Sequence, residues 1–89
     1  MTIYVVSEDN HGEIIYAVSK ESAKRALIET NWVEGATDIW IVNEKEKYGG
    51  HYESLLGLYG ENWEEEFMKM DDEALECMGF YIHDYEVWE

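Results

Sequence analysis

The 89-residue chain has no proline, one cysteine and only six basic residues against 21 acidic ones, which gives a formal net charge of −15. With Cys77 alone the chain cannot form an internal disulfide, a pattern typical of a reducing cytoplasm. The few basic residues argue against direct binding to nucleic acids or anionic membranes, because both need clustered positive charge. No basic leader precedes an apolar run, and no apolar stretch is long enough to span a bilayer. We therefore expect a cytoplasmic protein that binds neither membranes nor nucleic acids directly.

The residues that are abundant indicate a folded protein. Hydrophobic residues make up 46% of the chain and aromatic residues 15%, including four tryptophans and seven tyrosines. Disordered acidic segments lack aromatic residues at this level. A chain of this length suits one modest core, so we expect a single domain over residues 1–89.

Hydrophobic patterning predicts the order of the elements. Strands are expected at residues 2–8, 13–19, 37–44 and 80–88. Helices are expected at residues 20–33, 51–60 and 63–78, and a loop at 45–50. Ser19 is the expected N-cap of the first helix and Gly35 its stop, while Asn62 and Glu65 suit a capping box on the last helix. The ββαβααβ order predicts an α+β fold, with a small antiparallel sheet and helices packed on one face.

The negative charge is concentrated in the C-terminal half. Residues 1–47 carry nine acids and five bases, whereas residues 48–89 carry twelve acids and a single base, Lys69. The densest segment is NWEEEFMKMDDEALECMG at residues 62–79, where an apolar stripe is expected to face the sheet.

On one continuous helix the acids of this segment differ in their surroundings. Those at residues 64–66 lie in the first turn, where the helix dipole favours negative charge. Asp71, Asp72, Glu73 and Glu76 fall in the middle and the last turn, where the dipole gives no support and like charges one turn apart repel. Fold stability therefore explains about half of the charge in this segment, and the remainder suggests a function.

Carboxylates spaced by helical turns, as at Glu65, Asp72 and Glu76, resemble a row of phosphates roughly 6–7 Å apart. A rigid protein with such a row can occupy a basic, nucleic-acid-binding groove. The predicted partner-binding residues are Glu64, Glu65, Asp71, Asp72, Glu73, Glu76, Asp84 and Glu86. Apolar anchors are expected at Tyr48, Tyr52 and Tyr59. A solvated acidic surface that keeps the protein soluble explains the same acids, and both interpretations stay open.

No catalytic residue, cofactor or metal site is predicted. His11, His51, His83 and Cys77 show none of the paired spacings of metal ligands. Cys77 falls late in a helix, on or beside the apolar stripe, where a buried thiol behaves as a small hydrophobe. The glycine-rich YGGHY at residues 48–52 lacks the lysine and the hydroxyl residue of a phosphate-binding loop. We therefore expect a non-enzymatic binding protein.

The segments IYVVSEDNHG at residues 3–12 and ESAKRALIETNWV at 21–33, together with an acidic helix before a Y.V.E-like terminus, resemble small uncharacterised acidic proteins of phages and prophages of Gram-positive bacteria. The resemblance covers most of the chain and implies an origin in a mobile element. No motif of an inhibitor family accompanies it, so no functional residue is assigned from it.

Small acidic phage proteins are similar to DNA-mimic inhibitors, such as certain anti-CRISPR proteins, restriction inhibitors and uracil-glycosylase inhibitors. This analogy implies that the partner is a basic nucleic-acid-binding protein of the host, such as a nuclease, in the host cytoplasm. The alternative is a phage accessory or structural protein that binds another phage protein, or itself as a homodimer, without nucleic-acid mimicry.

Overall fold

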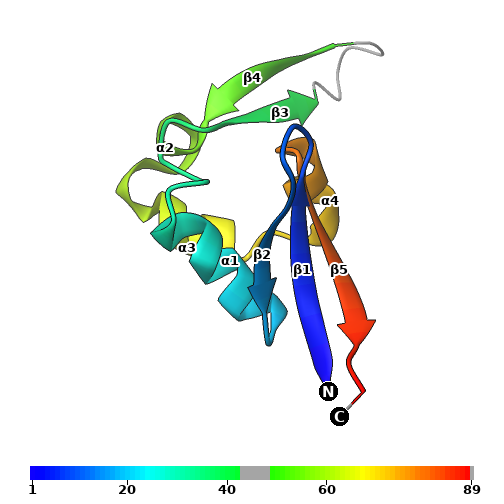
Figure 1. Cartoon of the computed structure of the whole chain (residues 1–89). Helices are drawn as coiled ribbons and strands as arrows, with labels where there is room; N and C mark the ends of the chain where they lie inside the picture. Colours follow the sequence, from blue (N-terminus) through cyan, green and yellow to red (C-terminus); the bar gives the residue numbers. More distant parts are fainter. Residues whose placement is uncertain (43–48, 89) are drawn as a thin grey trace.

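The fold is taken from a computed structural model that describes residues 1–42 and 49–88. The described elements follow one another as β1 (Thr2–Glu8), β2 (Gly12–Ala17), α1 (Lys20–Glu29), β3 (Asp38–Val42), β4 (Gly50–Ser54), α2 (Leu55–Tyr59), a 3-10 turn (Gly60–Asn62), α3 (Trp63–Met68), α4 (Asp72–Cys77) and β5 (Phe80–Glu86) (Figure 1). The predicted α+β class with antiparallel strands is confirmed. The longest described helix has ten residues, far fewer than the roughly 20 needed to cross a membrane.

The larger sheet has the strand order β2-β1-β5, and both pairs of neighbours are antiparallel. Strands β1 and β2 form a hairpin, because they are adjacent in the chain and pair in antiparallel fashion. A bulge shifts the register of β2 opposite Val6 and Ser7. Ile15 lies in the core and the preceding Ile14 packs against it, so two consecutive isoleucines serve one face.

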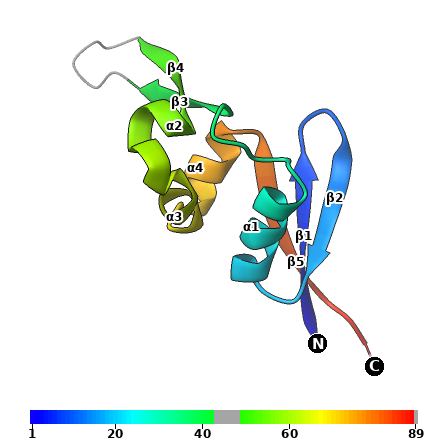
Figure 2. The same cartoon turned by 90° about the vertical axis from the view of Figure 1, so that its left-hand side faces the viewer.

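Helices lie on one side of this sheet only. Figure 2 shows α1, α3 and α4 on that side and no helix on the other. The side chains that fill the space between them are almost fully buried, and the largest are Phe67, Leu27, Leu55, Leu75, Val6 and Val33. Burying each such side chain contributes roughly 1.5–3 kcal/mol to the free energy of unfolding. The core therefore holds α1, α3 and α4 against one face of β1.

Helix α1 begins as predicted and ends earlier. The Ser19 hydroxyl accepts a hydrogen bond from the backbone N–H of Ser22 at 3.0 Å, and the Ser22 hydroxyl accepts one in return from the Ser19 N–H at 3.1 Å. This reciprocal cap satisfies two backbone donors that the first turn leaves free. The helix ends at Glu29 because Asn31 adopts a left-handed backbone with φ of 62°. The expected stop at Gly35 is therefore wrong, since asparagine tolerates this conformation well.

The segment predicted as a helix at 51–60 begins as a strand. Strand β4 pairs with β3 in a separate two-stranded sheet, and the rings of Trp40 and Tyr52 meet edge to face at 4.9 Å between centroids. A Cβ atom at Gly50 would lie 2.5 Å from the Trp40 ring, so the glycine makes room for the indole. Ser54 then caps the short helix α2. Residues 43–44 of the predicted third strand and most of the loop at 45–50 lie outside the described residues.

The predicted helix at 63–78 is two helices, α3 and α4. Asp71 interrupts it with an extended backbone, and its carboxylate accepts a hydrogen bond from the N–H of Ala74 at 2.9 Å. The Lys24 ammonium donates to the carbonyl of Met68 at 3.3 Å and to that of Met70. Lys24 thereby satisfies acceptors at the end of α3, while Asp71 satisfies a donor at the start of α4.

The expected capping box at Asn62 and Glu65 is also wrong. Asn62 makes no capping hydrogen bond, and its backbone has φ of −88° and ψ of 14°. A side-chain cap needs an extended backbone at this position. Asn62 instead belongs to the 3-10 turn between α2 and α3, so the backbone is already helical where α3 begins.

Replacing Asp71 by alanine should lower the free energy of unfolding by about 1 kcal/mol, because the start of α4 loses its cap. Asp71→Asn should stay close to the original, since asparagine is an equally good N-cap. Urea unfolding of both variants measures the difference. Equal losses in the two variants would show that the charge of Asp71, rather than its cap, stabilises the fold.

Candidate partner-binding surface

All eight acids predicted to contact a partner are exposed, but the structure divides them among three places. Glu64 and Glu65 lie in the first turn of α3. Asp71 caps α4, and Asp72 and Glu73 lie in its first turn. Further along the chain are Glu76 near the end of α4 and, on β5, Asp84 and Glu86.

The break between α3 and α4 changes the role of the acids around it. Asp71, Asp72 and Glu73 were expected to gain nothing from a helix dipole, and this expectation is wrong because they stand at the N-terminus of α4. Acids at such a position contribute typically 0.3–1 kcal/mol each. Glu76, near the C-terminal end of α4, is the exception. The predicted row of carboxylates does not form, because no helix joins Glu65 to Asp72.

The acids of β5 lie apart from those of the helices. Strand β5 begins at Phe80, shortly after α4 ends at Cys77, and runs away from that helix (Figure 1). At the rise of an extended strand, Asp84 and Glu86 are about 13 and 20 Å beyond Phe80. The predicted residues therefore form a dispersed acidic field with two centres, one on α3 and α4 and one at the end of β5.

Few described cations neutralise this field. Lys20 pairs with Asp72 at 3.1 Å and Lys69 with Glu66 at 3.5 Å, and the side chains of both pairs are largely in solvent. Exposed ion pairs contribute about 0–1 kcal/mol. Lys24 contacts backbone carbonyls rather than a carboxylate. Within the described part of the chain, no lysine or arginine nitrogen lies within 4.0 Å of the carboxylates of Glu64, Glu65, Glu73, Glu76 or Asp84.

The three tyrosines predicted as apolar anchors have different surroundings. Tyr52 is exposed on β4 beside Trp40. Tyr59 is half-buried and packs against the core, so it serves the fold. Tyr48 lies outside the described residues.

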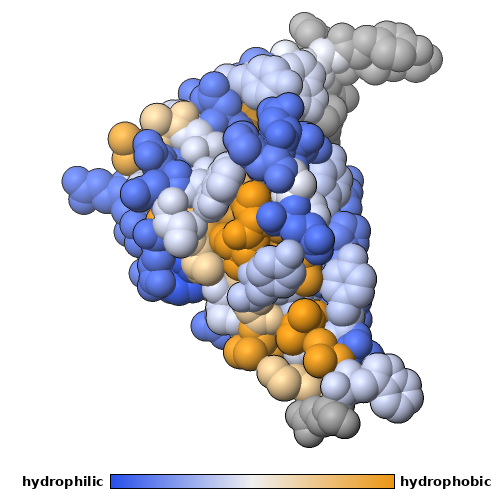
Figure 3. All heavy atoms as spheres, viewed as in Figure 1, coloured by the Kyte–Doolittle hydropathy of each residue, from blue (hydrophilic) through white to orange (hydrophobic). Residues whose placement is uncertain are grey.

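A surface that the sequence analysis did not single out is the side of the larger sheet that carries no helix. Its residues alternate along the strands with the core residues and lie opposite one another in register. They are Ile3, Val5, Ser7, Tyr16, Tyr81, His83 and Tyr85. We call this set the open sheet face. Figure 3 looks onto this side, and a band of apolar residues runs down it. The alternation of Tyr81, His83 and Tyr85 was visible in the sequence, but alternation alone does not show whether a face is covered.

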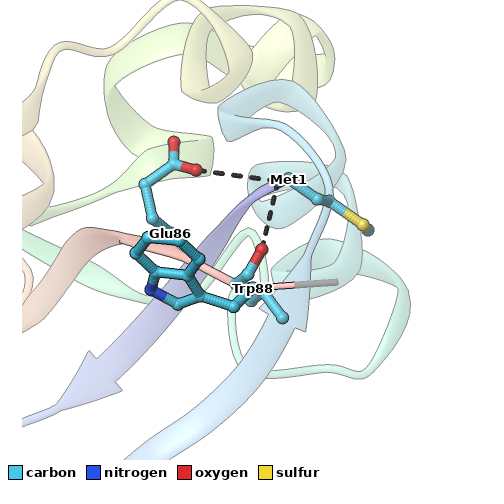
Figure 4. Close-up of a pocket in the computed structure, with 4 residues that line it drawn as sticks. Met1, Glu86 and Trp88 are labelled. Atoms are coloured by element: carbon cyan, nitrogen blue, oxygen red, sulfur yellow. Dashed lines mark hydrogen bonds and ion pairs between the residues drawn. The ribbon is translucent and has the colours of Figure 1, made fainter.

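A pocket lies at the end of the larger sheet where β1 begins and β5 ends. It is lined by Met1, Glu86, Val87 and Trp88 (Figure 4). The Met1 ammonium lies 3.6 Å from a Glu86 carboxylate oxygen and donates a hydrogen bond to the carbonyl of Val87 at 3.2 Å. The pocket therefore combines a carboxylate, an exposed indole and aliphatic side chains.

Two groups with shifted pKa values, Glu8 on β1 and Tyr81 on β5, lie beside the turn between β1 and β2, at the opposite end of the sheet. His11 is hydrogen-bonded to the Glu8 carboxylate, and this contact lowers the pKa of Glu8 below its usual range. The His11 ring also meets Trp32 edge-on at 5.1 Å between centroids. The Tyr81 hydroxyl is hydrogen-bonded to Asp9, which raises the pKa of Tyr81 because its ionisation would put two negative charges together.

Among residues 1–42 and 49–88, no group of three or more His, Cys, Asp or Glu side chains is placed to hold a metal ion. Cys77 is exposed, contrary to its expected place on or beside the apolar stripe. Leu75 is the residue that α4 buries, and a side chain two positions later points to the opposite side of a helix. Comparison of the chain with protein-family models, with curated proteins and with solved structures finds no match.

The melting temperature should rise between low and moderate salt, because screening weakens the repulsion among exposed carboxylates once the Debye length falls to about 10 Å at 0.1 M. Differential scanning calorimetry at fixed pH checks this. A melting temperature that does not change with salt would indicate that the carboxylates are too far apart to repel one another.

The Glu8–His11 contact should stabilise the fold in a defined pH range. Because the folded pKa of Glu8 is lowered, its contribution is present above the usual glutamate pKa of about 4.3 and is lost as the pH falls through the lowered value. Urea unfolding across this range should show a weaker pH dependence for Glu8→Gln. Glu29→Gln, at an exposed residue of α1, is the control and should behave like the original protein. Identical profiles for all three proteins would contradict the prediction.

Proposed function

We propose that this protein is a non-enzymatic inhibitor that occupies the basic, nucleic-acid-binding groove of a host protein. The observation that supports the proposal is a net charge of −15 on a folded domain, with carboxylates that the described cations leave largely uncompensated. When a basic groove binds DNA, the counterions condensed on the DNA are released, and their entropy favours binding. Binding of the same groove to a densely acidic protein surface releases counterions in the same way. The partner is expected in the cytoplasm of the host cell.

The proposed mimicry depends on the overall negative electrostatic field of the protein. It does not depend on a row of carboxylates spaced like phosphates. The acids at the starts of α3 and α4 are held by two short helices packed on the core, so their positions are fixed even though their spacing is not helical. A rigid surface loses less conformational entropy on binding than a disordered acidic tail does. This rigidity distinguishes the proposed inhibitor from a merely solubilising surface.

A second candidate function is that of a phage accessory protein that binds another phage protein or a second copy of itself. The open sheet face favours it, because the exposed side of an antiparallel sheet usually carries polar residues, whereas this one carries tyrosine, valine and isoleucine.

Capture from a lysate of a Gram-positive host tests the proposed function. The immobilised protein should retain nucleic-acid-binding proteins, identified by mass spectrometry, and an excess of duplex DNA should release them because the two compete. An uncharged polymer at equal mass is the control and should release nothing. Retention of proteins without nucleic-acid-binding activity, or retention that DNA does not affect, would contradict the proposal and favour the second candidate.

The acids of the helices should matter more to this capture than acids elsewhere. Replacing Glu64, Glu65, Glu73 and Glu76 by glutamine should weaken binding by about 1–3 kcal/mol and flatten its salt dependence. The matched control replaces four other exposed acids, namely Glu21, Glu29, Glu34 and Asp38, by their amides. Equal weakening in both variants would mean that net charge alone, and not the surface of α3 and α4, determines binding.

A further inference from the structure

We infer that the open sheet face is the apolar centre of the contact with the proposed basic partner, and that the acids around it form the polar rim. The inference rests on the proposed function and names the surface through which that function works. It adds an apolar contact on the sheet to the charged contacts of α3 and α4.

The composition of this face is that of an interface centre. Tyr16 is 65% exposed and Tyr85 50% exposed, and Val18, one residue beyond β2, is 68% exposed. Between them Val5 is only 2% exposed, because the sheet places it between Tyr16 on β2 and His83 on β5. The centres of protein–protein interfaces are enriched in aromatic residues such as tyrosine and depleted of charged residues.

The charged side chains on the open sheet face and at its turn end are acidic. Glu13 pairs with Ser7 in register and so points to this side, and Asp9 lies near Tyr81 at the same end of the sheet. Glu86, at the other end of the sheet, pairs with Thr2 and so points to the helix side rather than to this face. No lysine or arginine occurs in β1, β2 or β5. An apolar centre with an acidic rim is complementary to an apolar patch with basic residues around it.

The same charges argue against a second copy as the occupant. Pairing this face with itself would bring together two chains of net charge −15 and place acidic rim against acidic rim. A net charge this far from zero keeps proteins monomeric. A basic partner gains attraction from each of these contacts instead.

The pocket at the end of the larger sheet contains an exposed indole ring. Its Glu86 carboxylate already accommodates one cation, the Met1 ammonium at 3.6 Å, and the Trp88 indole beside it is 96% exposed (Figure 4). Arginine and lysine bind both to carboxylates and to the faces of indole rings. Because the Met1 ammonium already pairs with Glu86, the exposed Trp88 indole is the part of the pocket that a lysine or arginine of the partner can contact.

Two synthetic peptides of equal length and charge test the inference, one alternating lysine with leucine and the other lysine with serine. Each is titrated into the isotopically labelled protein at physiological salt and followed by NMR. The lysine–leucine peptide should bind at least fivefold more tightly and shift the amide signals of β1 and β5. The lysine–serine peptide should affect mainly the signals of α3 and α4.

A matched pair of variants separates the face from aromatic residues in general. Tyr16→Ser should remove the advantage of the lysine–leucine peptide, whereas Tyr52→Ser should keep it, although Tyr52 is equally exposed at 66%. Circular dichroism confirms that both variants fold. Should Tyr16→Ser unfold, Tyr85→Ser replaces it in the same comparison.

The outcomes distinguish the inference from the function on which it rests. Equal binding of both peptides, with shifts confined to α3 and α4, would overturn the inference and leave the proposed function in place. Binding of neither peptide would count against both. A concentration-dependent dimer in analytical ultracentrifugation that Tyr16→Ser abolishes would show that a second copy covers the face, which also overturns the inference.

Discussion

The arrangement of the second half of the domain depends on how the chain turns between α3 and α4. Lys24, on α1, donates hydrogen bonds to the carbonyls of Met68 and Met70, and Asp71 caps the helix that follows. These contacts join α1, α3 and α4 at one point. A continuous helix would direct the chain elsewhere, whereas the turn buries Leu75 and starts β5 at Phe80 beside β1. The third strand of the larger sheet, and with it the open sheet face, therefore depends on this turn.

The turn between α3 and α4 also changes how the positions of the acids in residues 62–79 are explained. Six of these seven acids stand at the start of a helix, so the fold accounts for nearly all of their placement. Their position alone is then no sign of function, and what needs a functional explanation is the excess of charge over available cations. An excess of charge acts through its field and needs no regular spacing. This is why the proposed mimicry is argued from net charge and rigidity.

The sequence predicted the elements that depend on local patterns. Strand β1 has the predicted bounds and Ser19 caps α1 as expected, because alternation and capping are encoded within a few residues. Strand β4 was missed because its pairing with β3 depends on Trp40 and Tyr52, which are not neighbours in the chain. The turn after α3 was missed for the same reason, since Lys24 is 46 residues from Met70. The exposure of the predicted acids followed from their charge, but their predicted grouping depended on a continuous helix that does not form. The alternation of residues in β5 could not show whether the open sheet face is covered.

The acidic field and the open sheet face would have different parts in recognising a basic partner. At physiological salt the Debye length is about 8 Å, so ions screen the attraction between exposed charges. The negative charge can therefore guide a basic partner toward the protein, but it contributes only weakly to the stability of the complex. A lasting complex needs contacts that salt does not screen, and burial of tyrosine and aliphatic side chains supplies them. The helical acids lie over a filled core and have no large exposed apolar side chain among them, whereas Tyr16 and Tyr85 lie on a face that no described helix covers. A basic partner that the negative electrostatic field attracts would therefore gain the most binding free energy by contacting the open sheet face.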